Sequence, residues 1–416
     1  MKLTIKNLAK ISKAEVELNG ITVVAGYNST GKSTISKALL GVMSAYSELN
    51  EDIIAQRSFE IQRALDSAVS GIIAVPAYYR RKTRMRRLAR ELSADRSLKV
   101  EKESLCLAAE EGLEEEEKER VEQYIQEHYE EICAEIEKKR DISEQDFASF
   151  LVNNQFRTVF DQQINTFGSD KVCTIDLSAK EEIHLEIVNN KVVELPLLTL
   201  KEATPFYIEP RHMLDMSARR YYTYQTDFSL YDDLSASESI APENMTLEQY
   251  TQREHSTAIV KELADQVMHG SLRPAEDAVR FYDNDFQSVV SVKNTASGIK
   301  SMALIARLIE NGKLAQRGML IIDEPEVNLH PEWQLRFANF LVRLNKELDI
   351  QILLTTHSPY FLRAIEKYAQ EWEVENGLKL YMTVPSREQE NLYTLKDVTD
   401  TPNLIFKQLY LPLESL

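Results

Sequence analysis

One short stretch of the sequence constrains the fold more than any other. It reads Gly26-Tyr27-Asn28-Ser29-Thr30-Gly31-Lys32-Ser33-Thr34, and it lies between an apolar run, Ile21–Ala25, and a segment with helical character, Ile35–Met43. Two glycines that bracket four residues and precede Lys-Ser form the phosphate-binding loop pattern, in which backbone N–H groups and a helix N-terminus surround a polyphosphate. The sequence therefore predicts a strand, a loop and a helix that bind a nucleotide.

The residue types in this loop predict individual roles. The two glycines permit backbone angles that turn consecutive N–H groups toward the phosphates. Lys32 is expected to contact the β and γ phosphates, and the Ser33 hydroxyl to ligate Mg²⁺. We expect the nucleotide-binding residues of the loop to be Gly26, Asn28, Ser29, Thr30, Gly31, Lys32, Ser33 and Thr34. Tyr27 is a weaker candidate for a ligand contact.

Composition narrows the class of protein. A chain of 416 residues predicts two or three domains. Its net charge of -17 argues against a protein that coats nucleic acid nonspecifically. Its three cysteines, Cys106, Cys133 and Cys173, lack the spacing of metal ligands, and no apolar stretch is long enough to span a membrane. We therefore expect a cytoplasmic protein without a membrane segment.

The pattern along the chain predicts a head that is interrupted by an insertion. Residues 1–45 begin an α/β nucleotide-binding head, residues 46–165 form a charged helical insertion, and residues 166–416 complete the head. Val121, Ile125, Ile132 and Ile136 recur at helical spacing in the insertion, which is typical of an antiparallel, coiled-coil-like hairpin. Two solvated helices that pack on the core would give the same pattern. A basic cluster precedes this segment and comprises Arg80, Arg81, Lys82, Arg84, Arg86, Arg87 and Arg90.

A second motif supplies two carboxylates. The apolar run Met319–Ile322 leads into Asp323 and Glu324, as expected of a buried strand whose carboxyl end carries ligand groups. We expect Asp323 to hold the Mg²⁺ ion that also contacts Ser33, and Glu324 to act as general base toward the attacking water. A surface strand that ends in an acidic pair is the alternative, which the following Pro325 makes less favourable.

Two further segments belong with these motifs. Ile350–Thr356 reads as another buried strand, and His357 follows it. If this strand runs parallel to the one before Asp323, the imidazole can hydrogen-bond a γ phosphate or the attacking water. Ser297 and Gly298 lie in a loop of small residues that opens a helix, a feature that by itself indicates only an ordinary helix cap.

Taken in their order along the chain, these motifs resemble those of the ABC-type ATPase heads of the SMC, RecF and OLD-like group, especially its AAA-15/AAA-21 branch. The resemblance implies an α/β P-loop NTPase head with a mixed or parallel sheet flanked by helices, and ATP with Mg²⁺ as cofactors. It assigns Lys32 and Ser33 to the Walker A loop, Asp323 and Glu324 to Walker B, and His357 to the switch histidine. It further assigns a signature loop to Ser297 and Gly298 and a D-loop to Asn328.

The resemblance also implies a dimer, because in such heads two protomers enclose two nucleotides. The signature reads Ala296-Ser297-Gly298-Ile299-Lys300 here, where many ABC proteins have Ser-Gly-Gly-Gln. Gln155 and Gln162 are available as Q-loop glutamines, but the sequence does not choose between them. Only 59 residues follow His357, so we expect an ATPase without its own Toprim nuclease domain.

These features lead to two functional hypotheses. The first is an ATPase that dimerises around ATP and senses for, or regulates, a partner effector encoded nearby, in bacterial anti-phage defence. The alternative is an SMC-like or RecF-like ATPase of DNA repair or maintenance, with nucleic acid bound by Arg80, Arg81, Arg84, Arg86 and Arg87. The subunit of a membrane transporter fits less well, because of the large insertion.

Overall fold

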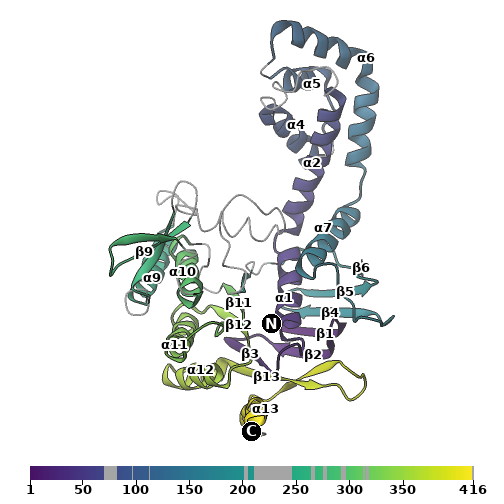
Figure 1. Cartoon of the computed structure of the whole chain (residues 1–416). Coiled ribbons are helices and arrows are strands. Elements are labelled where there is room, and N and C mark those ends of the chain that lie inside the picture. Colours follow the sequence, from purple (N-terminus) through teal and green to yellow (C-terminus); the bar gives the residue numbers. More distant parts are fainter. Residues whose placement is uncertain are drawn as a thin grey trace. The chain divides into compact units, whose positions relative to one another are not determined.

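The structure is a computed structural model (Figure 1). It describes residues 1–69, 82–95, 97–111, 113–200, 205–209, 246–263, 268–274, 279–291, 297–312, 314 and 318–414. The chain divides into two compact units. We call Met1–Ser47, Gln155–Pro196 and Leu200–Leu416 the head, and Glu48–Asn154 with Leu197–Thr199 the insertion. Arg80 and Arg81 of the predicted basic cluster lie outside the described residues.

An 11-stranded mixed sheet forms the centre of the head, with strand order β6-β5-β4-β1-β2-β14-β13-β3-β12-β11-β7. Its strands are β1 (Lys2–Leu8), β2 (Ile11–Glu17), β3 (Ile21–Ala25), β4 (Cys173–Ser178), β5 (Glu182–Val188), β6 (Lys191–Glu194), β7 (Phe206–Ile208), β11 (Met319–Asp323), β12 (Gln351–Thr356), β13 (Leu378–Pro385) and β14 (Tyr393–Asp397). The mixed α/β fold predicted from the sequence is confirmed.

Five strands of this sheet are mutually parallel and determine where ligands can bind. β3 lies between β13 and β12, and β11 lies between β12 and β7. Thr355 of β12 stands opposite Asp323 of β11 on one side and opposite Val24 of β3 on the other. The predicted parallel pairing of the two strands that carry Asp323 and His357 is therefore confirmed. Their carboxyl ends, and that of β3 before the glycine-rich loop, meet at one edge of the sheet.

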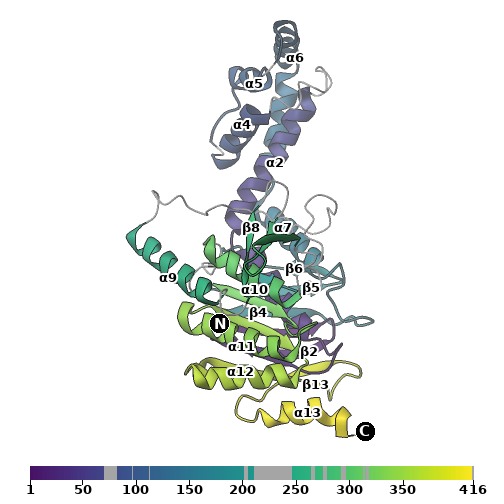
Figure 2. The same ribbon diagram turned by 60° about the vertical axis from the view of Figure 1, so that its left-hand side comes forward.

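Successive residues of a strand point to opposite faces of the sheet. The parallel strands are apolar on both faces, so helices cover both. One face buries Val23, Leu320, Ile322 and Leu354 against the apolar sides of three helices. These helices are α10 (Ser297–Glu310), α11 (Pro331–Leu348) and α12 (Pro359–Glu371), of which α11 and α12 lie side by side (Figures 1 and 2). α1 (Lys32–Tyr46) packs on β11 and β12. The phosphate loop is thus held between a buried strand and a buried helix.

The head contains further elements outside the large sheet. A 3-stranded sheet has the order β10-β9-β8. It consists of β8 (Gly270–Pro274), β9 (Val279–Asp283) and β10 (Ser288–Ser291), and α9 (Leu247–Leu263) precedes it in the chain. A short 3-10 helix, Glu375–Gly377, precedes β13, and α13 (Asn403–Glu414) follows β14. Among the described residues, no helix is both long and apolar enough to cross a membrane.

The insertion is helical, as its periodicity predicts, and its described residues form a small bundle in which two long helices pack on each other. Its helices are α2 (Leu49–Val69), α4 (Lys82–Ala94), α5 (Lys102–Ala109), α6 (Glu115–Arg140) and the first part of α7 (Glu144–Val159). The apolar residues that recur at helical spacing in α6 form its seam, and all four are buried: Val121, Ile125, Ile132 and Ile136. They share one core with Ile61 and Leu65 of α2 and with Met85, Ala89 and Leu92 of α4. The predicted pairing of long helices is present in α2 and α6, but the apolar pattern of α6 alone did not reveal the additional helices α4 and α5.

Candidate active site

The loop Gly26–Thr34 connects β3 to α1 and depends on its glycines. Gly26 has φ +156° and Gly31 has φ +90°, a backbone region that other residues rarely adopt. A Cβ atom on Gly26 would lie 1.9 Å from the Thr383 hydroxyl of β13. That hydroxyl is also hydrogen-bonded to the Thr30 hydroxyl at 2.8 Å. Thr383 therefore closes one wall of the loop, a contact across the sheet that the local sequence does not indicate.

Lys32 is the first residue of α1, and its side chain lies in the site. Its Nζ donates a hydrogen bond of 2.9 Å to the Tyr27 carbonyl and lies 3.6 Å from Glu324 Oε1. Burial lowers the pKa of Lys32, whereas the nearby carboxylates, Glu324 foremost, raise it. Because a carbonyl and a carboxylate already hold the ammonium group at the loop, the lysine is placed to receive a phosphate.

Asp323, at the end of β11, is buried and surrounded by hydroxyl groups. Its Oδ1 accepts hydrogen bonds from the Ser36 hydroxyl at 2.7 Å and from the Thr355 hydroxyl at 3.0 Å. Its Oδ2 accepts one from the Tyr207 hydroxyl of β7 at 2.8 Å. Burial is the main cause of the raised pKa of Tyr207, with the negative charge of Asp323 next. A carboxylate held by three donors keeps one orientation.

Sequence reasoning missed Ser36 and Tyr207. Ser36 lies one helical turn after Ser33, on the same side of α1, so the spacing of three is a signal that could have indicated it. Tyr207 offers no local signal, because its role depends on the pairing of β7 with β11. Ser33 itself is exposed at the start of α1.

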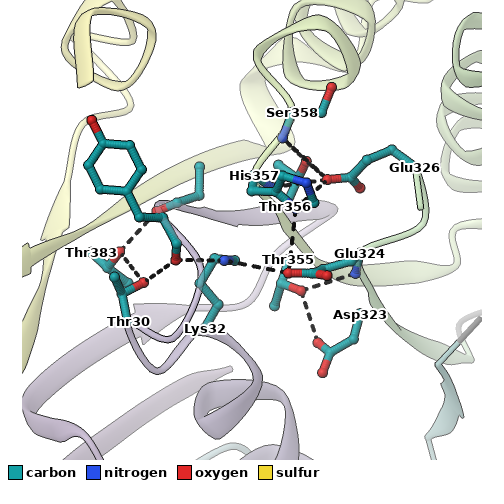
Figure 3. A network of polar contacts seen from close by, with 12 residues as sticks. Thr30, Lys32, Asp323, Glu324, Glu326, Thr355, Thr356, His357, Ser358 and Thr383 are labelled. Carbon is teal, nitrogen blue, oxygen red and sulfur yellow. Dashed lines mark hydrogen bonds and ion pairs between the residues drawn. The ribbon is translucent and has the colours of Figure 1, made fainter. Parts of the chain in front are cut away.

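The Glu324 carboxylate lies close to both Lys32 and His357 at the edge of the sheet (Figure 3). Glu324 has φ +49°, and its N–H donates to the carbonyl and to the hydroxyl of Thr355 at 3.1 and 3.2 Å. Its Oε1 lies 3.5 Å from His357 Nδ1. This contact with Glu324, with the further charge of Glu326, raises the pKa of His357. The strained backbone directs the Glu324 carboxylate toward Lys32 and His357 rather than along the strand.

Glu326 is a third carboxylate at this edge, and the sequence analysis assigned it no role. Its side chain is 2 % exposed. Its Oε1 accepts hydrogen bonds from the Thr356 hydroxyl at 2.6 Å and from the N–H groups of His357 and Ser358 at 3.0 and 3.2 Å (Figure 3). Burial raises the pKa of Glu326, and these donors oppose that effect. The residue thus holds the backbone on which His357 is carried.

The other predicted residues lie as follows. Asn28 and Ser29 are exposed in the loop, Thr30 is buried, and Thr34 follows Ser33 in α1. Ser297 and Gly298 are the first two residues of α10. Asn328 is exposed, with φ +62°, between β11 and α11. Gln155 lies in α7 and Gln162 in the turn after it, so neither is on a strand next to β11. One chain thus brings together Lys32, Asp323, Glu324 and His357.

This arrangement fits a magnesium nucleotide. Gly26 and Gly31 have no Cβ to collide with Thr383 and Ile11, so the loop can keep the turn that carries its N–H groups around a phosphate. Exposed Ser33 and the Asp323 carboxylate, a hydroxyl and a carboxylate oxygen, are ligand types that Mg²⁺ prefers. The buried lysine supplies the positive charge that a polyphosphate needs.

Comparison of the sequence with protein families agrees with this geometry. Residues 2–202 match AAA_23, described as "AAA domain". Residues 177–363 match AAA_21, described as "AAA domain, putative AbiEii toxin, Type IV TA system". The chain is 32% identical over 111 residues to the Escherichia coli protein named "Retron Ec83 probable ATPase". The match covers 22% of this chain and 20% of that relative, so the chain spans about a fifth of its length.

Solved structures with similar folds include two heads of SMC proteins. One is the SMC head bound to the C-terminal winged-helix domain of ScpA, with a TM-score of 0.45, 11% identity, and coverage of 95% of this chain and 97% of that one. The other is the SMC head domain from Thermotoga maritima, with a TM-score of 0.37, 10% identity, and coverage of 95% and 98%.

Proposed function

We propose that this chain is an ATPase of the SMC/RecF/ABC-like group, which binds ATP with Mg²⁺ at the loop Gly26–Thr34 and hydrolyses it. One observation carries the proposal. The ammonium group of Lys32 lies 3.6 Å from the Glu324 carboxylate, which lies 3.5 Å from the His357 imidazole. A phosphate-binding cation, a general base and a further donor therefore converge on one point.

Each residue has a role that follows from its position. The loop N–H groups and Lys32 bind the phosphates, while Ser33 and Asp323 hold the magnesium ion, whose chemistry is to neutralise phosphate charge. Glu324 takes a proton from the attacking water, and it lies beside Lys32, which binds the γ phosphate. The His357 imidazole donates to the γ phosphate, a role that its raised pKa favours.

The proposed active unit is a dimer of two copies. In that arrangement Ser297 and Gly298, at the N-terminus of α10, and the exposed Asn328 of one copy cap the nucleotide of the other. A helix N-terminus and small residues suit an anion. ATP added to the Glu324→Gln variant should then double the mass seen by light scattering. An Asn328→Ala change should weaken that response.

We further propose that the ATPase acts in the cytoplasm with a partner effector in defence against phage. The support is the short match to a retron ATPase and the AAA_21 family description. The copurification of an effector encoded by a neighbouring gene, retained when ATP is present and lost without it, is the expected observation. The absence of any ATP-dependent partner would remove this part of the proposal.

Nucleic-acid binding by α4 is the second candidate function. Arg84, Arg86, Arg87 and Arg90 are all exposed on this helix, opposite buried Met85 and Ala89. Such a face can contact phosphates, and the affinity would fall steeply with salt. Two of these arginines already lie beside acids, Arg84 at 4.0 Å from Glu111 and Arg87 at 2.9 Å from Glu91. Replacing Arg86 and Arg90 with Glu should abolish DNA binding if this candidate is correct.

The ATPase proposal is tested by phosphate release from ATP. Glu324→Gln should lower kcat by about 10²-fold or more while ATP still binds, because general-base catalysis contributes on this order. Glu390→Gln is the matched control, since Glu390 is exposed in the turn after β13. If Glu324→Gln turns over ATP at the wild-type rate, the assignment of the site is wrong.

A further inference from the structure

We propose that Glu326 is a positioning residue for ATP hydrolysis, which acts by holding the His357 loop in register with Glu324. The proposal rests on the function proposed above, since it concerns the same site. In our assignment Glu326 does not contact ATP. Its effect on the reaction passes through His357.

The first argument is the geometry of the hydrogen bonds. A single oxygen, Glu326 Oε1, accepts from three consecutive residues: the hydroxyl of Thr356 and the N–H groups of His357 and Ser358. These residues are the end of β12 and the turn into α12. N–H groups at such a turn have no sheet partner, and a buried N–H without an acceptor is costly. Glu326 therefore determines the path of the backbone at the histidine.

The second argument is the way in which Glu326 is itself held. It follows Glu324 by two residues in the segment between β11 and α11, whose residues Val327 and Leu329 donate backbone hydrogen bonds to the carbonyls of Glu324 and Glu326. Gln334 of α11 joins the same two segments a second time. Its Oε1 accepts from the Ser358 hydroxyl at 3.2 Å, and its Nε2 donates to the Leu329 carbonyl at 3.1 Å. The base and the histidine are thus carried by two loops that are joined at two points.

The third argument concerns the acceptors around the imidazole. His357 Nδ1 lies 3.4 Å from Glu326 Oε1 and 3.5 Å from Glu324 Oε1. Without Glu326, the imidazole has only the Glu324 carboxylate as a nearby acceptor, which would draw it toward the base and away from the γ phosphate. Glu326 Oε1 is the second acceptor, and it limits this movement. This function needs an acceptor at Oε1, which glutamine retains and alanine does not.

The experiment is a double-mutant cycle in the full chain, with kcat and KM for ATP measured for wild type, Glu326→Ala, His357→Ala and the double variant. We expect Glu326→Ala to lower kcat by about 10²-fold, as a misplaced catalytic group does, with little change in KM. The double variant should be no slower than His357→Ala alone, because residues that act through each other are not additive. Glu326→Gln should restore most of kcat.

Glu366→Gln is the control for burial, since Glu366 is also a buried carboxylate and pairs with Arg363 at 3.2 Å in α12, away from the site. It should leave kcat unchanged. Losses that multiply in the double variant would overturn the proposal, as would a Glu326→Gln variant as slow as Glu326→Ala. If Glu326→Ala unfolds, Glu326→Asp, which keeps the charge but shortens the reach, should show the same fall in kcat and the same coupling to His357.

This experiment separates the two proposals. Suppose that the wild type hydrolyses ATP, that Glu324→Gln abolishes this activity, and that Glu326 shows no coupling to His357. Only the positioning role would then be wrong. A wild-type protein with no turnover, or a Glu324→Gln variant of full activity, would remove the proposed function and the positioning role together.

Discussion

The carboxyl edge of the parallel strands and the helical insertion use charged residues in opposite ways. At the edge, Lys32, Asp323 and Glu326 are each at most 4% exposed. Every one of them has polar partners within hydrogen-bonding distance. In the insertion, the charges of α4 and α6 mostly face solvent, and apolar residues form the interior. Buried charge is costly unless it is paired, so a cluster of it indicates a working site, whereas the insertion shows ordinary amphipathic packing.

The largest expected effect is at the phosphate loop. Gly26→Ala should abolish ATP binding, because the new Cβ would lie 1.9 Å from the Thr383 hydroxyl at a backbone angle that alanine disfavours. Binding of a fluorescent ATP analogue measures this effect. Gly168→Ala is the control, since Gly168 also has a positive φ, +71°, but no atom lies within 4 Å of the added carbon. Retained binding in Gly26→Ala would mean that ATP binding does not require the close approach of Thr383 to Gly26.

The second largest effect is expected in the interior of the insertion. Ile136→Ala should lower the free energy of unfolding by about 2–5 kcal/mol, because it removes a fully buried side chain from the seam of α6. Chemical denaturation followed by circular dichroism measures the loss. Glu135→Ala, the exposed neighbour, should change it by less than about 0.5 kcal/mol. Equal effects of the two changes would show that α6 does not pack through this seam.

Two serines of α1 are expected to differ in role: Ser36 stabilises the fold, whereas Ser33 binds the ligand. Ser36→Ala should cost about 1–2 kcal/mol of unfolding free energy, because Asp323 loses its 2.7 Å donor inside the protein. Ser33→Ala should leave stability nearly unchanged, since the hydroxyl is exposed, but should raise the Mg²⁺ concentration needed for ATP turnover. If Ser36→Ala gives the magnesium effect instead, the roles of the two serines are reversed.

The smallest effect is expected at the surface of the insertion. Arg87 and Glu91 form an i,i+4 ion pair of 2.9 Å, but their side chains are 81% and 52% exposed. Solvent and salt screen such a pair, so Arg87→Ala should cost no more than about 0.5 kcal/mol. The difference from wild type should vanish in concentrated salt. A loss of more than about 1 kcal/mol would make this charge part of a structural network and weaken the contrast between the two regions.

The local elements of the site could be predicted from the sequence because they depend on neighbouring residues. β3 occupies the predicted apolar run, α1 begins at Lys32, and α10 begins at Ser297. The strand before Asp323 was equally clear from its apolar run. Parallel pairing then follows from a general rule of α/β folds, and it brings Asp323 and His357 to one edge. The number of helices in the insertion did not follow, because α4 reads mainly as a basic segment.

The amino-acid order alone was enough to identify a phosphate loop, two acidic residues at the end of one strand and a histidine after another. These are motifs whose chemistry lies in residue type and short spacing. The side chains that support these motifs could be identified only from the folded chain. Ser36 and Asp323 are 287 residues apart, Thr30 and Thr383 are 353 apart, and Glu326 lies 31 residues before His357. Such contacts depend on strand order and register, which arise from packing the whole sheet rather than from any local pattern.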